Sequence, residues 1–239
     1  MPLRILFGAV VVAALIAGAF VFMRGGFRPA PQGGDAIAST LKNPLGDAPD
    51  PNDPGEKNYK KGLYPEAMDY WTARAAAGDG TAAYRLGVEY MDGKVVKRDF
   101  TKALQYHLQA AKSGNPMSMF DVGSIHEYGY GVSKDIVQAA LWYGRSANYG
   151  LAQGQYNFGT MLEAGEGVAK DEVEAYKFFI LAARGGFTGV PYNNESLRID
   201  RNAPLPTQLL ERKLSREQIA DGRQRAADFK VANGPLKSE

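Results

Sequence analysis

His107 and His126 are the histidines of the chain and the side chains best suited to proton transfer near neutral pH. Both positions recur at intervals of 36 residues, where other packing side chains stand: Tyr143 and Phe179 for His107, Tyr90 and Leu162 for His126. We therefore expect packing residues and not general bases. The chain has no cysteine, and a zinc site would need both histidines plus carboxylates at a spacing that the sequence lacks. We expect no metal and no cofactor.

Ser39 and Lys42 form a Ser-x-x-Lys sequence, the nucleophile motif of penicillin-recognising enzymes. That chemistry needs a helix start in a large mixed domain and two further motifs, and neither partner motif occurs. Two Gly-x-Gly pairs later in the chain have no third glycine at the distance of a dinucleotide-binding loop and follow no expected strand. We interpret the serine motif as a chance match and the glycine pairs as turns.

The composition is that of a folded protein with nearly balanced charge. Hydrophobic residues make up 45% and charged residues 23% of the 239 positions, and the formal net charge is +2. A nucleic-acid site needs a clustered basic face, and the densest basic group, Lys57, Lys60 and Lys61, is short enough to be a solvated helix end. The absence of cysteine also excludes disulfides and cysteine nucleophiles. We expect neither a nucleic-acid partner nor a small-molecule substrate.

Residues 1–23 contain the expected membrane segment. Ile5 to Met23 is a run of 19 residues without charge, and as a helix it would span about 28 Å, close to the hydrocarbon core of a bilayer. The alternative is a cleaved secretory signal, with Arg4 as its charged region and Ala17 to Ala19 as the cleavage site. The apolar run continues beyond that site, which favours an uncleaved anchor.

The orientation of this anchor is poorly determined, because arginines lie on both sides of it. We expect a single-pass inner-membrane protein whose folded domain is periplasmic. Secretion after signal cleavage and a domain that faces the cytoplasm are the alternatives. Residues 24–55 then carry six prolines, from Pro29 to Pro54, among several glycines, a composition that predicts an extended tether.

The sequence beyond the tether repeats itself at an interval of 36 residues. A fixed period of this length is typical of a helical repeat array. Nine positions keep the same or a similar residue type in three successive copies: Tyr84, Phe120 and Tyr156; Gly87, Gly123 and Gly159; Gly93, Gly129 and Gly165; Val96, Val132 and Val168; Asp99, Asp135 and Asp171; Ala103, Ala139 and Ala175; Tyr106, Trp142 and Phe178; Ala111, Ala147 and Ala183; Gly114, Gly150 and Gly186.

The residue pattern of each copy predicts two helices joined by a turn that contains glycine. The first helix has a glycine at its middle, such as Gly123, where glycine costs about 1 kcal/mol relative to alanine. We therefore expect a neighbouring helix to approach closely at this point. The second helix begins at an aspartate, and Gln138 follows Asp135 by three residues as Glu174 follows Asp171, the spacing of a capping box.

The same patterns divide the rest of the chain. We expect an N-terminal half-repeat at 56–81, full repeats at 82–117, 118–153 and 154–186, an irregular connection at 187–206, capping helices at 207–231 and a tail at 232–239. Ser215 and Gln218 predict a capping box for the last helix, and a repeat array needs such ends because its stacking face is otherwise exposed. The predicted fold class is all-α, an α/α superhelical solenoid that follows an N-terminal transmembrane helix and a flexible tether.

The string from Tyr84 to Tyr90, the loop from Gly129 to Asp135 and the group Leu141-Trp142-Tyr143 together resemble the Sel1-like repeat, a relative of the tetratricopeptide repeat. The resemblance extends from about Leu63 to Gly186, with departures at Val95, His107 and Phe179. It implies an α/α superhelix whose members act as adaptors and scaffolds, and therefore a protein that is not an enzyme.

The resemblance also implies that the first helix of each pair lines a concave face. Positions on this helix that face away from its partner differ between the copies, and we expect them to bind a peptide or protein segment; a merely solvated surface is the alternative. They are Arg85, Val88, Glu89, Asp121, Ser124, Ile125, Tyr128, Asn157, Thr160 and Met161. Ile125, Tyr128 and Met161 favour a peptide groove, because exposed apolar groups with polar neighbours often mark contact sites.

The sequence therefore predicts a membrane-anchored scaffold that binds a protein or peptide. An envelope protein that binds the cell wall or is associated with a hydrolase is the first alternative. A regulatory subunit of a membrane enzyme is the second.

Overall fold

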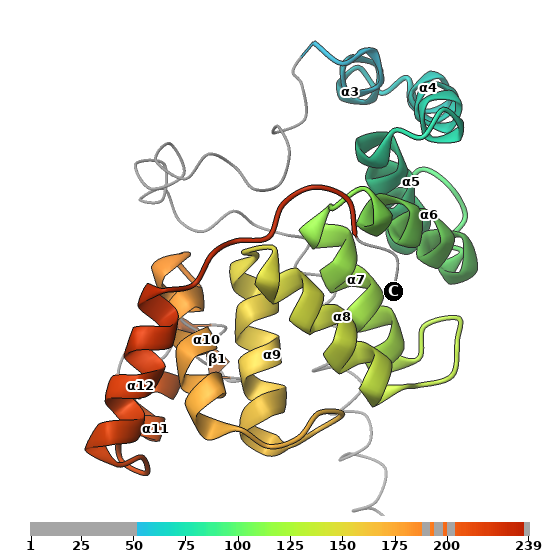
Figure 1. Ribbon diagram of the computed structural model, residues 1–239. Helices are drawn as coiled ribbons and strands as arrows, with labels where there is room; N and C mark the ends of the chain where they lie inside the picture. The colour runs from blue at the N-terminus through green and yellow to red at the C-terminus, as the bar shows by residue number, and fades with distance from the viewer. Residues whose placement is uncertain (1–51, 188–191, 194–197, 200–203, 237–239) are drawn as a thin grey trace, which may run out of the picture. The chain divides into compact units, whose positions relative to one another are not determined.

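The computed structural model describes residues 52–187, 192–193, 198–199 and 204–236 (Figure 1). The chain divides into two compact units, one made of residues 1–41 and 190–203 and the other of residues 42–189 and 204–239. All the described helices belong to the second unit. The predicted anchor at 1–23 and nearly all of the predicted tether at 24–55 lie outside the described residues.

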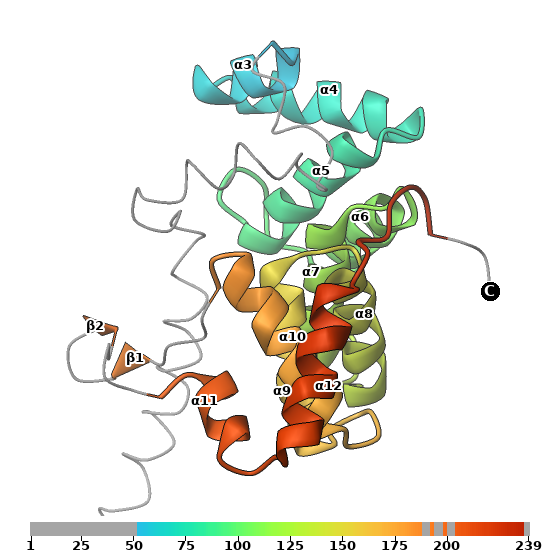
Figure 2. The ribbon, with the colours of Figure 1, turned by 60° about the vertical axis from the view of Figure 1, so that its left-hand side comes forward.

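The described residues of the second unit form ten helices (Figures 1 and 2). Helices α3 to α10 each pack on the next one in the chain, and α11 and α12 both pack on α10. They are α3 (Pro54–Lys60), α4 (Tyr64–Ala76), α5 (Gly80–Asp92), α6 (Phe100–Lys112), α7 (Pro116–Tyr128), α8 (Ile136–Asn148), α9 (Ala152–Ala164), α10 (Glu172–Arg184), α11 (Pro206–Glu211) and α12 (Arg216–Ala227). The six helices from α5 to α10 are each 13 residues long, and their starts follow the 36-residue period. The predicted all-α solenoid of helix pairs is confirmed.

The ends of the repeat helices are set by local sequence. Gly129 ends α7 in the left-handed conformation, at a φ of 74°, as the glycine turn predicts. At the start of α8 the Asp135 carboxylate accepts hydrogen bonds from the backbone N–H groups of Val137 and Gln138, which is the usual N-cap arrangement. The second half of a capping box, from the Gln138 side chain back to Asp135, does not form. Ser215 and Gln218 at α12 make both halves.

The glycine in the middle of each first helix lies against a ring from the second helix of the same repeat. The pairs, with the distance from a Cβ built on the glycine to the nearest ring atom, are Gly87 with His107 at 2.8 Å, Gly123 with Tyr143 at 2.8 Å and Gly159 with Phe179 at 3.0 Å. Real Cβ atoms almost never come closer than 3.0 Å to a neighbour. The predicted close approach is confirmed, and the ring of the partner helix is its cause.

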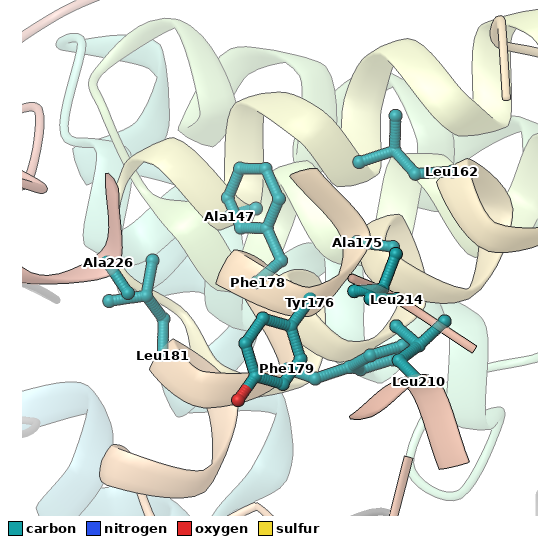
Figure 3. Packing of buried hydrophobic residues seen from close by; sticks show 10 residues of the cluster. All are labelled: Ala147, Leu162, Ala175, Tyr176, Phe178, Phe179, Leu181, Leu210, Leu214 and Ala226. Atoms are coloured by element: carbon teal, nitrogen blue, oxygen red, sulfur yellow. The ribbon is translucent and has the colours of Figure 1, made fainter. Parts of the chain in front are cut away.

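The half-repeat and the C-terminal helices reproduce this contact at the two ends of the array. Gly55 of α3 lies under the Trp71 indole of α4, and Trp71 stands 36 residues before His107. At the other end, Gly222 of α12 approaches the ring of Tyr176, with 2.7 Å to a built Cβ. Figure 3 shows the core that this end closes, made of Ala147, Leu162, Ala175, Tyr176, Phe178, Phe179, Leu181, Leu210, Leu214 and Ala226.

In the first full repeat the ring that lies against the glycine, that of His107 against Gly87, is polar. Its ring is fully buried, and its Nδ1 lies 3.4 Å from Ser118 Oγ and 3.5 Å from Asp121 Oδ2. Burial lowers the pKa of His107 to about 3. Burial, with a smaller effect from the charge of Asp92, raises the pKa of Asp121 to about 7. Between about pH 4 and pH 6 both groups are therefore mostly neutral in the folded protein.

The first unit contributes one described feature, a pair of antiparallel two-residue strands. Tyr192–Asn193 (β1) pairs with Arg198–Ile199 (β2), and Tyr192 lies opposite Ile199. These strands fall within the connection that was expected to be irregular, at 187–206. None of the described helices combines the length and the apolar character that crossing a membrane would require.

Replacing Gly123 by Ala should destabilise the protein. The new Cβ would overlap the Tyr143 ring, and overpacking of a core costs about 1–3 kcal/mol, partly offset by the roughly 1 kcal/mol that alanine gains in a helix. We expect the free energy of unfolding in urea to fall by up to about 2 kcal/mol. The same replacement in a Tyr143→Ala background should instead raise it by up to roughly 1 kcal/mol, because the ring is gone and only the helix preference of alanine remains. An equal loss in both backgrounds would contradict the contact.

Replacing Asp121 by Asn should stabilise the protein at neutral and alkaline pH. Because the folded-state pKa of Asp121, about 7, lies above the usual aspartate value of 3.8, the folded state binds the proton more strongly, and stability falls as the pH rises between these values. The gain in unfolding free energy should be near zero at about pH 4 and about 1 kcal/mol above pH 7, a modest figure because 23% of the side chain is exposed.

Urea titrations across this pH range measure the gain at each pH. Asp69→Asn, which changes an exposed aspartate of α4, is the matched control and should leave stability nearly unchanged. A gain at position 121 that did not vary with pH would show that the carboxyl group is not titrating as described.

Candidate interaction surface

Three of the ten predicted surface positions are buried. Glu89 is 7%, Ile125 0% and Met161 5% exposed. Met161 packs on Ala139 and Tyr143 of α8, so it faces the preceding repeat and not solvent. The expectation that Ile125 and Met161 are exposed apolar groups is therefore wrong. Both side chains face away from their partner helix, but they help to fill the interior of the helical array.

Arg85 and Glu89, at the start of the predicted surface, contact the half-repeat. Arg85 Nε lies 2.5 Å from Glu56 Oε1, and both side chains are largely buried. Burial raises the pKa of Glu89, although a hydrogen bond with Tyr59 opposes the shift. Burial, with the nearby Glu89 charge, raises the pKa of Tyr59 to about 12. These contacts hold α3 against α5. Val88, the remaining predicted position on α5, is half-buried.

A polar network occupies the centre of the predicted surface, between α7 and α9. The Tyr143 hydroxyl donates to Glu127 Oε2 at 2.6 Å and lies 3.0 Å from Ser124 Oγ. It also shares a hydrogen bond with the Asn157 side chain. Burial and then the Glu127 charge raise the pKa of Tyr143 far above its usual value. The structure thus brings Ser124 and Asn157 together through the hydroxyl of Tyr143, a side chain that is itself buried.

Tyr128 and Thr160 are the exposed members of the predicted set. Tyr128 is 53% exposed. Thr160 lies on α9, where its hydroxyl donates to the Tyr156 carbonyl at 3.1 Å. Asp121, near the middle of α7, is half-buried and lies beside His107. The positions that remain accessible are therefore concentrated on α7 and α9.

Tyr128 is the outer member of a row of aromatic side chains that the sequence did not predict. Its ring stacks on Tyr130 at 5.5 Å between centroids, and Tyr130 stacks on Phe100 at 5.0 Å. The Arg98 guanidinium carbon lies 5.7 Å from the Phe100 centroid. The available signal was Tyr130 in the loop between Gly129 and Gly131, since the loops of the neighbouring repeats hold charged residues at that place.

The Ser118, His107 and Asp121 side chains contain the residue types of a hydrolytic triad but not its geometry. Serine and aspartate both approach the same histidine nitrogen, Nδ1, so the ring cannot accept a proton from one and be oriented by the other. The ring is also closed to solvent. Ser39 lies outside the described residues. The described residues contain no group of three or more His, Asp or Glu side chains placed to hold a metal.

A shallow hollow between α10, α11 and α12 is filled with paired polar groups. The Tyr176 hydroxyl donates to Glu211 and accepts from Arg223 Nε at 3.2 Å, while Arg223 Nη2 lies 2.9 Å from Glu211. Their charges and hydrogen bonds are directed at one another, so the network joins the C-terminal helices to α10.

The Sel1 repeat family matches this chain at residues 80–115, 116–150 and 152–187. The matched segments begin where α5 and α7 begin and where α9 begins. No curated protein matches the sequence.

Two solved structures resemble the helical array. A protective antigen of uropathogenic Escherichia coli strains, described as displaying an SLR fold, is 31% identical, with a TM-score of 0.50, over 52% of this chain and 27% of that one. A Sel1 repeat protein from Oxalobacter formigenes is 30% identical, with a TM-score of 0.52, over 54% of this chain and 53% of that one. This chain therefore spans about a quarter and about half of their lengths. The helix pairs, their period and these matches together show that residues 80–187 form three Sel1 repeats.

Proposed function

We propose that this chain is a scaffold that binds a segment of a partner protein on the accessible positions of α7 and α9, and that residues 5–23 anchor it in a membrane. Sel1 repeat proteins generally mediate protein–protein interaction and are generally not catalysts. The observation that supports this surface most is the exposed Tyr128 ring near the carboxylate of Glu127, which the buried Tyr143 hydroxyl holds in place.

The proposed surface offers two kinds of contact. The Tyr128 ring supplies a flat apolar face at low entropic cost, as tyrosine does at many interfaces. Glu127 accepts one hydrogen bond from Tyr143 and keeps acceptor capacity for a partner. A segment with an apolar side chain next to a lysine, arginine or amide donor would match both features.

Rigid support favours recognition at this place. The buried Tyr143 ring packs closely on Gly123, and its hydroxyl donates to Glu127, so the Glu127 carboxylate is held in position before a partner arrives. A preorganised polar group loses little conformational entropy on binding. Arg85 and Glu89, by contrast, are engaged with the half-repeat, and we no longer place them in the partner-binding set.

Photo-crosslinking in cells should identify this face. A photo-reactive amino acid placed at Tyr128 or Thr160 should give a discrete adduct with a partner protein. The same amino acid at Val137 or Leu141 of α8, which are 59% and 41% exposed, should give none. Adducts from α8 alone, or equal adducts from both helices, would count against the proposed surface.

Cell fractionation tests the anchor. The full chain should remain in the membrane pellet after alkaline carbonate extraction, whereas a chain that begins after Met23 should be released. The mass of the extracted protein distinguishes the two predicted processing routes, because cleavage after Ala19 would remove the anchor. Release of the uncleaved full chain would contradict anchoring.

A further inference from the structure

The segment after α12, residues 228–236, runs back across the array instead of leading away from it (Figures 1 and 2). The backbone N–H of Ala232 donates to the Asn148 carbonyl at 2.8 Å. The N–H of Leu236 donates to the Lys112 carbonyl at 3.0 Å. The C-terminal segment therefore contacts the second repeat and then the first.

These two hydrogen bonds follow the repeat. Asn148 and Lys112 are the last residues of α8 and α6, and they lie 36 positions apart. Their tail partners lie four positions apart and run in the opposite direction. The last carbonyls of a helix have no partner within it, so each helix pair presents one open acceptor at the same place. The four residues from one hydrogen bond to the next include a bend at Gly234, whose φ is 79°.

The side chains of the tail alternate between contact and exposure. Ala232 and Leu236 are partly buried against a cluster made of Ala111, Met119, Val122, Trp142 and Tyr149. Val231 before them is exposed, as are the residues between them, Asn233, Gly234 and Pro235. The Gly234 carbonyl crosses Gly114 so closely that a Cβ there would lie 2.2 Å from its oxygen.

The surface under the tail continues beyond it. Ala76, the last residue of α4, is equivalent to Lys112 and Asn148, and its carbonyl accepts no backbone hydrogen bond from the described residues. A Cβ on Gly78, which is equivalent to Gly114, meets nothing within 4 Å. The described part of the tail thus covers two acceptors of a row that has at least three.

The tail is held by few contacts for its length. Two main-chain hydrogen bonds and two partly buried side chains order seven residues that follow α12, from Lys230 to Leu236. Ordering each residue costs conformational entropy, and segments with few buried contacts open at low free energy. A competing peptide could therefore take its place.

We propose that the row of helix ends at Ala76, Lys112 and Asn148, with the apolar cluster beside it, binds an extended peptide of a partner protein. The recognised peptide carries a small side chain and, four residues later, a large aliphatic one, and main-chain hydrogen bonds fix its register. The C-terminal tail, with Ala232 and Leu236 at this spacing, occupies the row as a tethered competitor. This surface differs from the face of α7 and α9 described above, and neither depends on the other.

Fluorescence anisotropy with a labelled peptide of residues 228–239 tests the proposal on the full chain. The double variant Ala232→Asp with Leu236→Asp should release the tail, because neither partly buried position tolerates a charge. The matched control, Val231→Asp with Asn233→Asp, places the same two carboxylates at exposed positions of the same segment. We expect the peptide to bind the released variant at least fivefold more tightly than the wild type or the control, because the tethered tail competes at a high effective concentration.

Absence of binding to a folded released variant would overturn the proposal, as would equal affinity for all three proteins. Circular dichroism and the melting temperature establish that the released variant is folded.

Hydrogen exchange in the wild-type chain provides an independent test. The amides of Ala232 and Leu236 should exchange more slowly than those of Val231 and Asn233, and excess unlabelled peptide 228–239 should accelerate them. Exchange that the peptide leaves unchanged would contradict displacement. Protection that disappeared on dilution together with a dimer would assign the row to the tail of a second copy and would also overturn the proposal.

Discussion

The contact between a glycine of one helix and a ring of the next governs this structure. In every full repeat the first helix has no side chain at its centre, and the ring from the second helix occupies that space, at 2.8 Å from a built Cβ in the first two repeats and at 3.0 Å in the third. The arrangement fixes how far apart the two helices lie, and it recurs with Trp71 at the N-terminal end and Tyr176 at the C-terminal end. Because the ring varies among tryptophan, histidine, tyrosine and phenylalanine, the geometry requires a flat group of suitable size more than a particular chemistry.

The same contact determines which polar groups meet at the ring position. Tyr143 places its ring in the core and its hydroxyl among Ser124, Glu127 and Asn157. Phe179 fills the equivalent space without a hydroxyl. His107 directs a nitrogen toward Asp121, a carboxyl group whose pKa is raised by burial. The ring position of the second helix therefore has different polar surroundings in each of the three repeats, although the arrangement of the two helices stays the same.

Much of the fold could be predicted from the sequence because its causes are local and repeated. The left-handed φ at Gly129 and the capping box at Ser215 follow from neighbouring residues, and the close approach at Gly123 follows from the recurrence of a costly glycine. The exposure of Ile125 and Met161 was predicted wrongly. A position that faces away from its partner helix meets either solvent or another repeat, and the periodicity of one helix does not distinguish these cases. The docking of the tail left no signal in the sequence, since it depends on main-chain hydrogen bonds. The anchor at 5–23 stays a prediction.

Between its two hydrogen bonds the tail advances four residues while the repeats step back by 36. This ratio links two lengths that evolution could otherwise change separately. An array that gained one helix pair would offer one more acceptor, and a tail of unchanged length would then stop one step short. Duplication of a repeat would therefore leave one acceptor without a tail residue. A tail that still reached it would have to be about four residues longer for each added helix pair.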